Sequence, residues 1–206
     1  MAVSPARENI LKNIRQALSN PVPLPFPHSE GTQPVFKPAI EDLLVQFAEE
    51  FTKLQGRFAF CTDLNDLKLQ LQQLLVEKHW TKIFFKEDKI VSLFKINSYP
   101  NLAGCEISVT GCEYLVARTG TVVMSTAQQS GRTTSVYAPI HICVAFSNQV
   151  VYDIKDALQL LKEKYAGKLP SLITFASGPS RTADIEKTLV TGVHGPKEVY
   201  CFLVEA

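Results

Sequence analysis

The chain has 206 residues, which is enough for one full α/β domain with its own core. Hydrophobic residues make up 46% and charged residues 20%, a composition that excludes a disordered or fibrous chain. The 21 Lys and Arg residues and the 20 Asp and Glu residues give a net charge of +1. The chain therefore lacks the strong positive electrostatic potential that would attract nucleic acid or an anionic membrane as a partner.

The first predicted element is an amphipathic helix that begins at Ser4 and Pro5, with Ser as N-cap and Pro at the first helical position. It has no apolar core of a secretory signal, and no stretch of the chain reaches the ~20 apolar residues that span a bilayer. The five cysteines are odd in number and include no CxxC pair, so we expect a reducing compartment and a cytoplasmic protein.

Residues 21–38 hold six of the twelve prolines, which is typical of an extended linker or strap. A strap packed on the chain's own domain and a polyproline ligand for a partner are both open readings. The predicted organisation is therefore an N-terminal helix and strap over residues 1–38, followed by an α/β domain over residues 39–206.

Helices and strands alternate through most of the second part. Apolar runs predict strands over 57–62, 81–86, 140–146, 171–177 and 198–206. Apolar stripes at helical spacing predict helices over 40–54, 64–75, 87–96 and 154–165, and a further helix after the turn at 178–180. Residues 105–125 predict two or three short strands. Because most strands are apolar throughout, we predict a Rossmann-like, mostly parallel sheet with helices on both faces.

Four polar stretches could carry chemistry. In the first, Thr119, Gly120 and Thr121 stand between two apolar strands, where backbone N–H groups and hydroxyls could cradle a phosphate or carboxylate. An ordinary hairpin turn is the structural alternative.

The second stretch is the polar loop 128–135, which could lie over a cleft with Arg132 as a bidentate clamp for an anion. A solvated loop would have the same composition.

The third stretch follows the predicted strand 171–177. Ser177, Gly178, Ser180 and Arg181 would form a backbone cradle at the carboxyl end of that strand and at the start of the predicted helix. In the structural alternative, these residues only cap the helix.

The fourth stretch, 191–196, holds His194 between two glycines, where it could transfer a proton or simply cap a helix. The predicted site joins these four bends at one rim, around a small negatively charged ligand. No metal site is predicted, because His141 and Cys143, two residues apart, are too few ligands for one. The simpler interpretation is that His141 lies at the edge of the sheet and that Cys143 is a thiol in the core.

The run SGPSRTADIEKTLVTGVHGP at 177–196, together with TGTVVMST at 119–126 and Gly131-Arg132, resembles the LUD-domain family. The resemblance covers residues 40–206. It implies a fold like that of the ribose-5-phosphate isomerase, glucosamine-phosphate deaminase and CoA-transferase group.

The resemblance also implies a subunit of a lactate-utilisation system, which supports oxidation of L-lactate to pyruvate with iron–sulfur partner subunits. Any iron–sulfur cluster is expected in those partners and none in this chain. Whether the chain is itself an enzyme stays open. One alternative is a stand-alone enzyme on a phosphosugar or acyl-CoA, and another is a scaffold subunit. Family members often have an acidic residue at the position of Arg118. If the Arg118 side chain faced inward, its positive charge would attract carboxylates to the 119–121 turn.

Overall fold

The structure, a computed structural model, describes residues 5–19, 42–94, 97–185 and 188–206. The chain divides into two units, residues 1–38 and 39–206, which are described separately. In the first, helix α1 spans Pro5–Ser19, as the sequence predicts. The predicted N-cap Ser4 and the proline-rich strap lie outside the described residues. No helix among the described residues is both long enough and apolar enough to cross a membrane.

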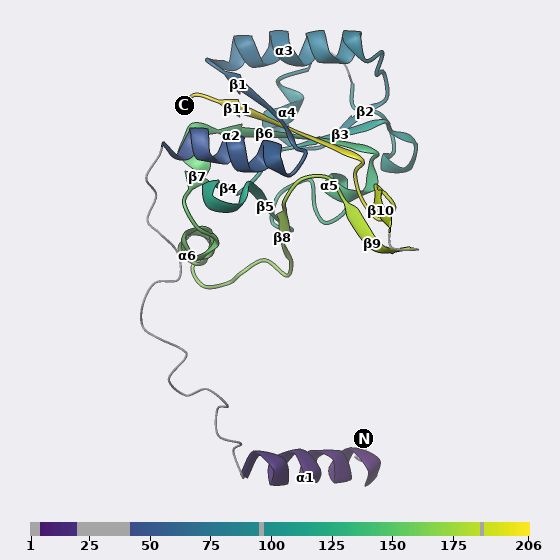
Figure 1. The fold of residues 1–206 in the computed structure, drawn as a ribbon, viewed down its shortest axis with the longest axis vertical. Coiled ribbons are helices and arrows are strands. Elements are labelled where there is room, and N and C mark those ends of the chain that lie inside the picture. Colours follow the sequence, from purple (N-terminus) through teal and green to yellow (C-terminus); the bar gives the residue numbers. More distant parts are fainter. Residues whose placement is uncertain (1–4, 20–41, 95–96, 186–187) are drawn as a thin grey trace. The chain divides into compact units, whose positions relative to one another are not determined.

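The second unit is built on a five-stranded parallel sheet (Figure 1). Its order is β1-β11-β6-β3-β2, and every neighbouring pair runs parallel. The strands are β1 Arg57–Cys61, β2 Ile83–Phe85, β3 Ile107–Thr110, β6 Ile140–Phe146 and β11 Glu198–Val204. The predicted fold class is confirmed, and the strand that comes last in the sequence lies between β1 and β6, inside the sheet.

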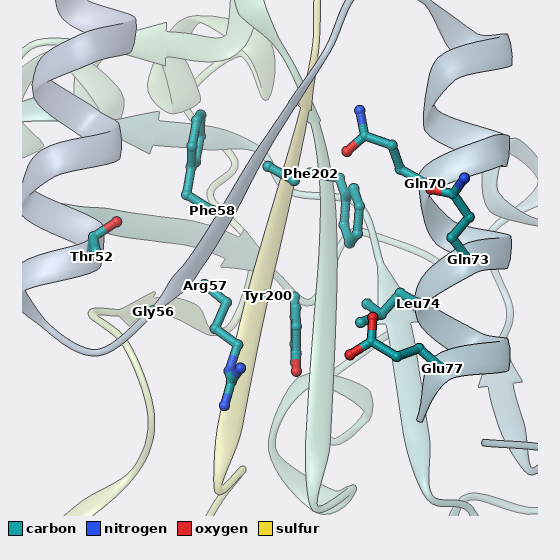
Figure 2. A pocket seen from close by; sticks show the side chains of 11 residues that line it. Thr52, Gly56, Arg57, Phe58, Gln70, Gln73, Leu74, Glu77, Tyr200 and Phe202 are labelled. Atoms are coloured by element: carbon teal, nitrogen blue, oxygen red, sulfur yellow. The ribbon is translucent and has the colours of Figure 1, made fainter. Parts of the chain in front are cut away.

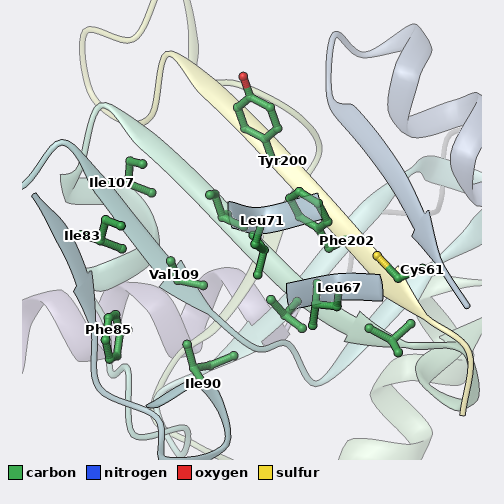
Figure 3. Close-up of a cluster of buried hydrophobic side chains, with 13 residues drawn as sticks. Cys61, Leu67, Leu71, Ile83, Phe85, Ile90, Ile107, Val109, Tyr200 and Phe202 are labelled. Atoms are coloured by element: carbon green, nitrogen blue, oxygen red, sulfur yellow. The ribbon is translucent and has the colours of Figure 1, made fainter. Parts of the chain in front are cut away.

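Two helices cover the two faces of this sheet. Helix α3, Leu64–Glu77, packs Leu67 and Leu71 on one face, where they join a cluster with Ile107 and Phe202 (Figure 3). Helix α2, Leu43–Lys53, buries Phe47 and Phe51 on the other face. Asp42 and Asp63 begin α2 and α3 by accepting hydrogen bonds from backbone N–H groups of the first turn. Strand β1 forms the outer edge between these helices (Figure 2).

A second sheet, which the sequence did not predict as a separate layer, packs on the α2 face. Its order is β7-β4-β5-β8, formed by β4 Tyr114–Val116, β5 Thr121–Ser125, β7 Val150–Val151 and β8 Ile173–Ala176. Strand β5 is antiparallel to β4 and to β8. Helix α6, Ile154–Lys164, covers the far side through Ala157 and Leu161. Shorter helices are α4, Asp88–Val91, and α5, Thr134–Tyr137.

The predicted helix after residue 180 is wrong. The segment forms an antiparallel hairpin of β9, Arg181–Ile185, and β10, Thr188–Thr191. Its β-branched threonines, isoleucine and valine favour extended backbone, and this preference prevails over the Ser and Thr signals for a helix start.

The reading of His141 as an edge residue is also wrong, because β6 has β11 on one side and β3 on the other. His141 is 1% exposed, and its Nε2 lies 2.8 Å from Thr110 Oγ1 on the neighbouring strand. Burial lowers the pKa of this imidazole. Cys143 lies in the core, and all five cysteines are buried free thiols.

Candidate functional site

A cavity of about 850 Å³ lies where strands of the parallel sheet end. Because β2, β3 and β6 run in one direction, the residues that follow them meet at one edge, and open α/β sheets bind ligands at this edge. Segments after all three strands line the cavity, among them Glu87, Gly111 and Asn148. We call it the carboxyl-edge pocket. Its further walls are Ile90, Val144, Phe146, Gln128, Gln129, Lys164 and Tyr165.

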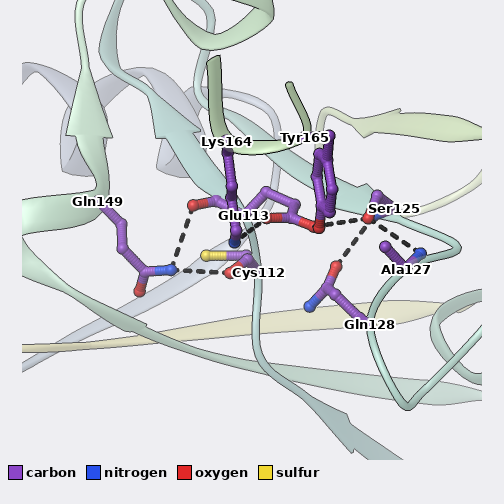
Figure 4. Close-up of polar contacts among 8 residues, drawn as sticks. All are labelled: Cys112, Glu113, Ser125, Ala127, Gln128, Gln149, Lys164 and Tyr165. Carbon is purple, nitrogen blue, oxygen red and sulfur yellow. Dashed lines mark hydrogen bonds and ion pairs between the residues drawn. The ribbon is translucent and has the colours of Figure 1, made fainter. Parts of the chain in front are cut away.

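Glu113 is a nearly buried carboxylate in the wall of this pocket, with 3% of its surface exposed. Its Oε1 accepts hydrogen bonds from Ser125 Oγ at 2.5 Å and from Tyr165 OH at 2.7 Å. Its Oε2 accepts one from Lys164 Nζ at 2.7 Å (Figure 4). Glu113 follows β3, whereas its donors belong to β5 and to the end of α6, so this cluster ties the two sheets together.

Burial raises the pKa of a carboxyl group, because a buried charge is poorly solvated. At Glu113 this effect is outweighed by the hydrogen bonds from Lys164, Ser125 and Tyr165, and the pKa falls below its ordinary value of 4.5. Burial likewise opposes the charge of Lys164, but Glu113 raises the pKa of this ammonium above its ordinary value. The pocket wall therefore holds an ion pair at neutral pH.

Glutamine side chains fix the rim of the pocket. Gln149 Nε2 donates to the carbonyls of Cys112 and Glu113, at 2.7 and 3.2 Å, and its Oε1 accepts from Phe146 N at 2.8 Å. Gln149 thereby joins the end of β6 to the end of β3. Gln128 Oε1 accepts from Ser125 N at 2.9 Å. Such side-chain to backbone bonds hold a site in one geometry before a ligand arrives.

The polar loop after β5 is fastened to the segment after β2. Ser130 Oγ donates to Glu87 Oε1, which also accepts from Gly111 N at 3.0 Å. Gln129 and Asp88 exchange two hydrogen bonds, each of 2.8 Å. Gln128 and Gln129 of this loop line the carboxyl-edge pocket, whereas Arg132 is not among its lining residues.

The predicted bends at 119–121 and 177 do meet. Thr121 Oγ1 lies 2.8 Å from Thr119 Oγ1 and 2.6 Å from Ser177 Oγ. Between the threonines, Gly120 adopts a φ of 55° and approaches the α2 backbone so closely that an added Cβ would lie 2.4 Å from Phe51 N. This turn is a contact between β5 and α2.

Gly178 and Arg181 pack on the end of the same helix. Both approach the carbonyl oxygen of Leu54: an added Cβ on Gly178 would lie 2.5 Å from it, and the Arg181 guanidinium donates to it. The expected cradle at a helix N-terminus is therefore replaced by contacts with the C-terminal end of α2.

Two further predicted residues lie near the hairpin. Ser180 N donates to Pro196 O, and Ser180 O accepts from Gly192 N, both at 2.9 Å. His194 is exposed and lines a separate cavity of about 400 Å³ with Tyr137 and Lys197.

Arg132 lies apart from the 119–121 turn. Its Nη2 donates to Ser171 Oγ at 2.8 Å, and Ser171 precedes β8, whereas Ser177 follows it. The expectation that all four bends converge at one rim is therefore wrong for Arg132, because an antiparallel pair of strands separates them. Anion binding by the individual predicted residues stays a prediction.

Arg118 does not present its charge to the 119–121 turn as expected. Its Nε lies 2.5 Å from Asp153 Oδ2, and both side chains are largely buried. The ion pair joins the turn to the start of α6. Among the described residues, no three His, Cys, Asp or Glu side chains gather as a metal site.

Comparison with known proteins gives a consistent result. A sequence model of the LUD domain matches residues 58–204. The chain is 37% identical to lactate utilization protein C of Bacillus licheniformis over 101 residues, which are 48% of this chain and 42% of that protein. It is 27% identical to lactate utilization protein C of Anoxybacillus flavithermus over 183 residues, covering 80% of this chain and 81% of that protein.

The fold also matches a solved structure of a DUF162-family protein from Deinococcus radiodurans. The TM-score is 0.60 at 17% identity, covering 79% of this chain and 96% of the other. Several relatives, among them the Bacillus protein and one from Halalkalibacterium halodurans, are matched over less than half of their length, 42% and 44%.

Proposed function

The chain belongs to the LUD-domain family, and from this membership we propose that it acts in lactate utilisation, as a subunit that supports oxidation of L-lactate to pyruvate alongside iron–sulfur proteins. The observation that carries the proposal is the similarity to proteins named lactate utilization protein C, which in one case extends over 80% of this chain. The sequence has no CxxC pair, and among the described residues no three His, Cys, Asp or Glu side chains gather as a metal site, so we assign the clusters to partner subunits.

We further propose that the carboxyl-edge pocket binds the small anion, with Lys164 as its cation. An ammonium has three donor hydrogens, so Lys164 can hold Glu113 and a carboxylate at once. Its side chain is 53% exposed, which leaves it accessible to a ligand. A hydroxy acid needs an acceptor for its hydroxyl as well as a cation, and Glu87 and Glu113 supply carboxylates in the same pocket.

Growth of the native host tests the pathway. Deletion of the gene is expected to abolish growth on L-lactate and to leave growth on pyruvate unchanged. A tagged chain is expected to co-purify with proteins that contain iron and absorb visible light. Normal growth on lactate would contradict the proposal, and turnover of a phosphosugar or CoA ester by the isolated chain would support the enzyme alternative.

Titration with L-lactate and pyruvate, followed by calorimetry, tests the pocket. Lys164→Gln is expected to weaken binding at least about tenfold, since it removes the charge that pairs with the carboxylate. Lys162→Gln is the matched control, because Lys162 also lies near the end of α6 but does not line the pocket. Equal binding by both variants would rule out Lys164 as the cation.

A further inference from the structure

Strand β1 leaves one of its edges open to a further strand. It pairs with β11 on one side, and in the described part of the chain no strand pairs on the other. Cys61 O accepts from Glu205 N on the β11 side, whereas Phe60 O accepts from Gln70 Nε2 of α3 on the outer side. Because backbone groups alternate along a strand, Phe58 and Phe60 direct both N–H and C=O outward. An open edge of this kind is a template for pairing.

The side chains of β1 divide between the two faces of the sheet. Phe58 packs with Phe47 on the α2 face. By alternation Phe60 points to the same face, and it remains 42% exposed. On the α3 face, the small Ala59 lines a groove of about 530 Å³ together with Leu74 and Tyr200 (Figure 2).

We propose that this edge is an interface between two copies of the chain, in which β1 pairs antiparallel with β1 of a second copy about a two-fold axis at Ala59. In this register, Phe58 of each copy stands opposite Phe60 of the other. Both residues direct their backbone groups outward, so each pair exchanges two N–H···O bonds. The carbonyl of Phe60 has two lone pairs, so it can accept from the second copy and keep Gln70.

The side chains are self-complementary in this register. The exposed Phe60 ring of one copy covers Phe58 of the other, an aromatic cross-strand pair on each side of the axis. Ala59 meets Ala59 at the axis on the α3 face, beside the groove that it lines.

The charges at the ends of the pair are also complementary. Arg57 of one copy stands opposite Cys61 of the other. Asp66 and Asp63 lie close enough to Cys61 to act on its thiol, so Arg57, which pairs with Glu198 of its own chain at 3.1 Å, would come near two further carboxylates. A parallel pairing would instead place Arg57 beside Arg57. The strand thus fits a second copy of itself in the antiparallel direction, and this inference is independent of the proposed function.

Analytical ultracentrifugation of the full chain tests the interface. At about 100 µM we expect a dimer, with twice the 22.9 kDa mass of the chain. Phe60→Lys places two charges in the paired edge and is expected to halve the observed mass. Leu160→Lys is the matched control on α6, where Leu160 is 36% exposed, and it is expected to remain a dimer. Circular dichroism establishes that each variant is folded. A monomeric parent chain, or a dimeric Phe60→Lys variant, would overturn the proposal.

A disulfide cross-link tests the register. Residues at a non-hydrogen-bonded antiparallel pair have Cα atoms ~4.5 Å apart, within the range that a disulfide spans. Ala59→Cys is therefore expected to form a covalent dimer under mild oxidation, whereas Leu160→Cys is not. The native cysteines are buried, which keeps the background low. A dimer that does not cross-link at position 59 would refute the Ala59 axis.

Discussion

Glu113 ties the stability of the folded chain to pH. Its pKa is lower in the folded chain than the ordinary 4.5, so its ionisation favours folding above that pH, and the contribution is lost as the pH falls through the folded pKa. We expect Glu113→Gln to lower the free energy of unfolding by ~1–3 kcal/mol at pH 7, because the bonds from Lys164 and Tyr165 lose their charge. Below the folded pKa the difference should shrink.

Urea unfolding at a series of pH values measures this effect. Glu49→Gln is the control, since Glu49 is an exposed residue of α2 whose contact with Lys53 is 3.8 Å long. It should unfold like the parent chain at every pH. A Glu113→Gln variant whose stability falls in acid as steeply as that of the parent chain would contradict the prediction.

Gly120 shows how one backbone conformation positions a helix. Its φ of 55° strains any residue with a Cβ, and the added atom would also meet the α2 backbone. We expect Gly120→Ala to cost ~2–4 kcal/mol of unfolding free energy in urea. Gly131→Ala is the matched control, because Gly131 has a φ of 70° but no heavy atom within 4 Å of the added Cβ, and should cost ~1 kcal/mol. Equal losses would mean that contact with α2 has no energetic role.

At the scale of elements, Asp153 connects α6 to the turn before β5. It caps α6 by accepting from Lys155 N at 3.0 Å and pairs with Arg118. The hydrogen bond from the Lys155 backbone lowers the pKa of Asp153 most, and Arg118 lowers it further. Burial acts in the opposite direction, but the pKa remains below its ordinary value. A double-mutant cycle of Arg118→Met and Asp153→Asn is expected to give a coupling of about 1 kcal/mol, since the pair is largely shielded from water.

The exposed pair Lys53–Glu50 within α2 is the control for this cycle. Its coupling is expected at ~0.2–0.5 kcal/mol, the range for neighbouring charges on a helix surface. Purely additive effects of Arg118→Met and Asp153→Asn would show that the contact does not hold α6 in place.

The sequence predicts elements well where one local signal dominates. Buried strands such as 140–146 have long apolar runs, and α3 has both an Asp cap and a Leu stripe. The hairpin after residue 180 was not predicted, because Ser180 and Thr182 are typical of helix starts. The two strands of the hairpin are stabilised by pairing with each other, and the spacing of residues along the sequence does not reveal that pairing. The second sheet was missed because β4 and β7 are too short to reveal their partners.

The carboxyl-edge pocket is harder to foresee than the strands around it. Glu113 and Lys164 are 51 residues apart, and each resembles an ordinary surface charge until the fold brings them together. The strand-end position of Glu113 was a usable signal, since ligand sites follow parallel strands. The predicted site consists instead of glycine- and threonine-rich turns, and at 120 and 178 the glycine serves close packing on α2.

At the scale of the whole molecule, stability is expected to be uneven. Strands β11 and β6 have neighbours on both sides and are buried along most of their length, whereas β9 and β10 form a two-stranded hairpin. Hydrogen exchange followed by mass spectrometry should therefore show β11 and β6 exchanging only with global unfolding, and the hairpin exchanging much sooner. Equal protection in both regions would contradict this picture.

The central place of β11 has a consequence for biosynthesis. Strands β1 and β6 are made long before residues 198–204 leave the ribosome. Both pair with β11, so the sheet cannot join them until β11 has been made. A nascent chain therefore carries an unfinished sheet in which β1 and one edge of β6 lack their partner, and its apolar surface is open to chaperones or to aggregation until that segment is translated.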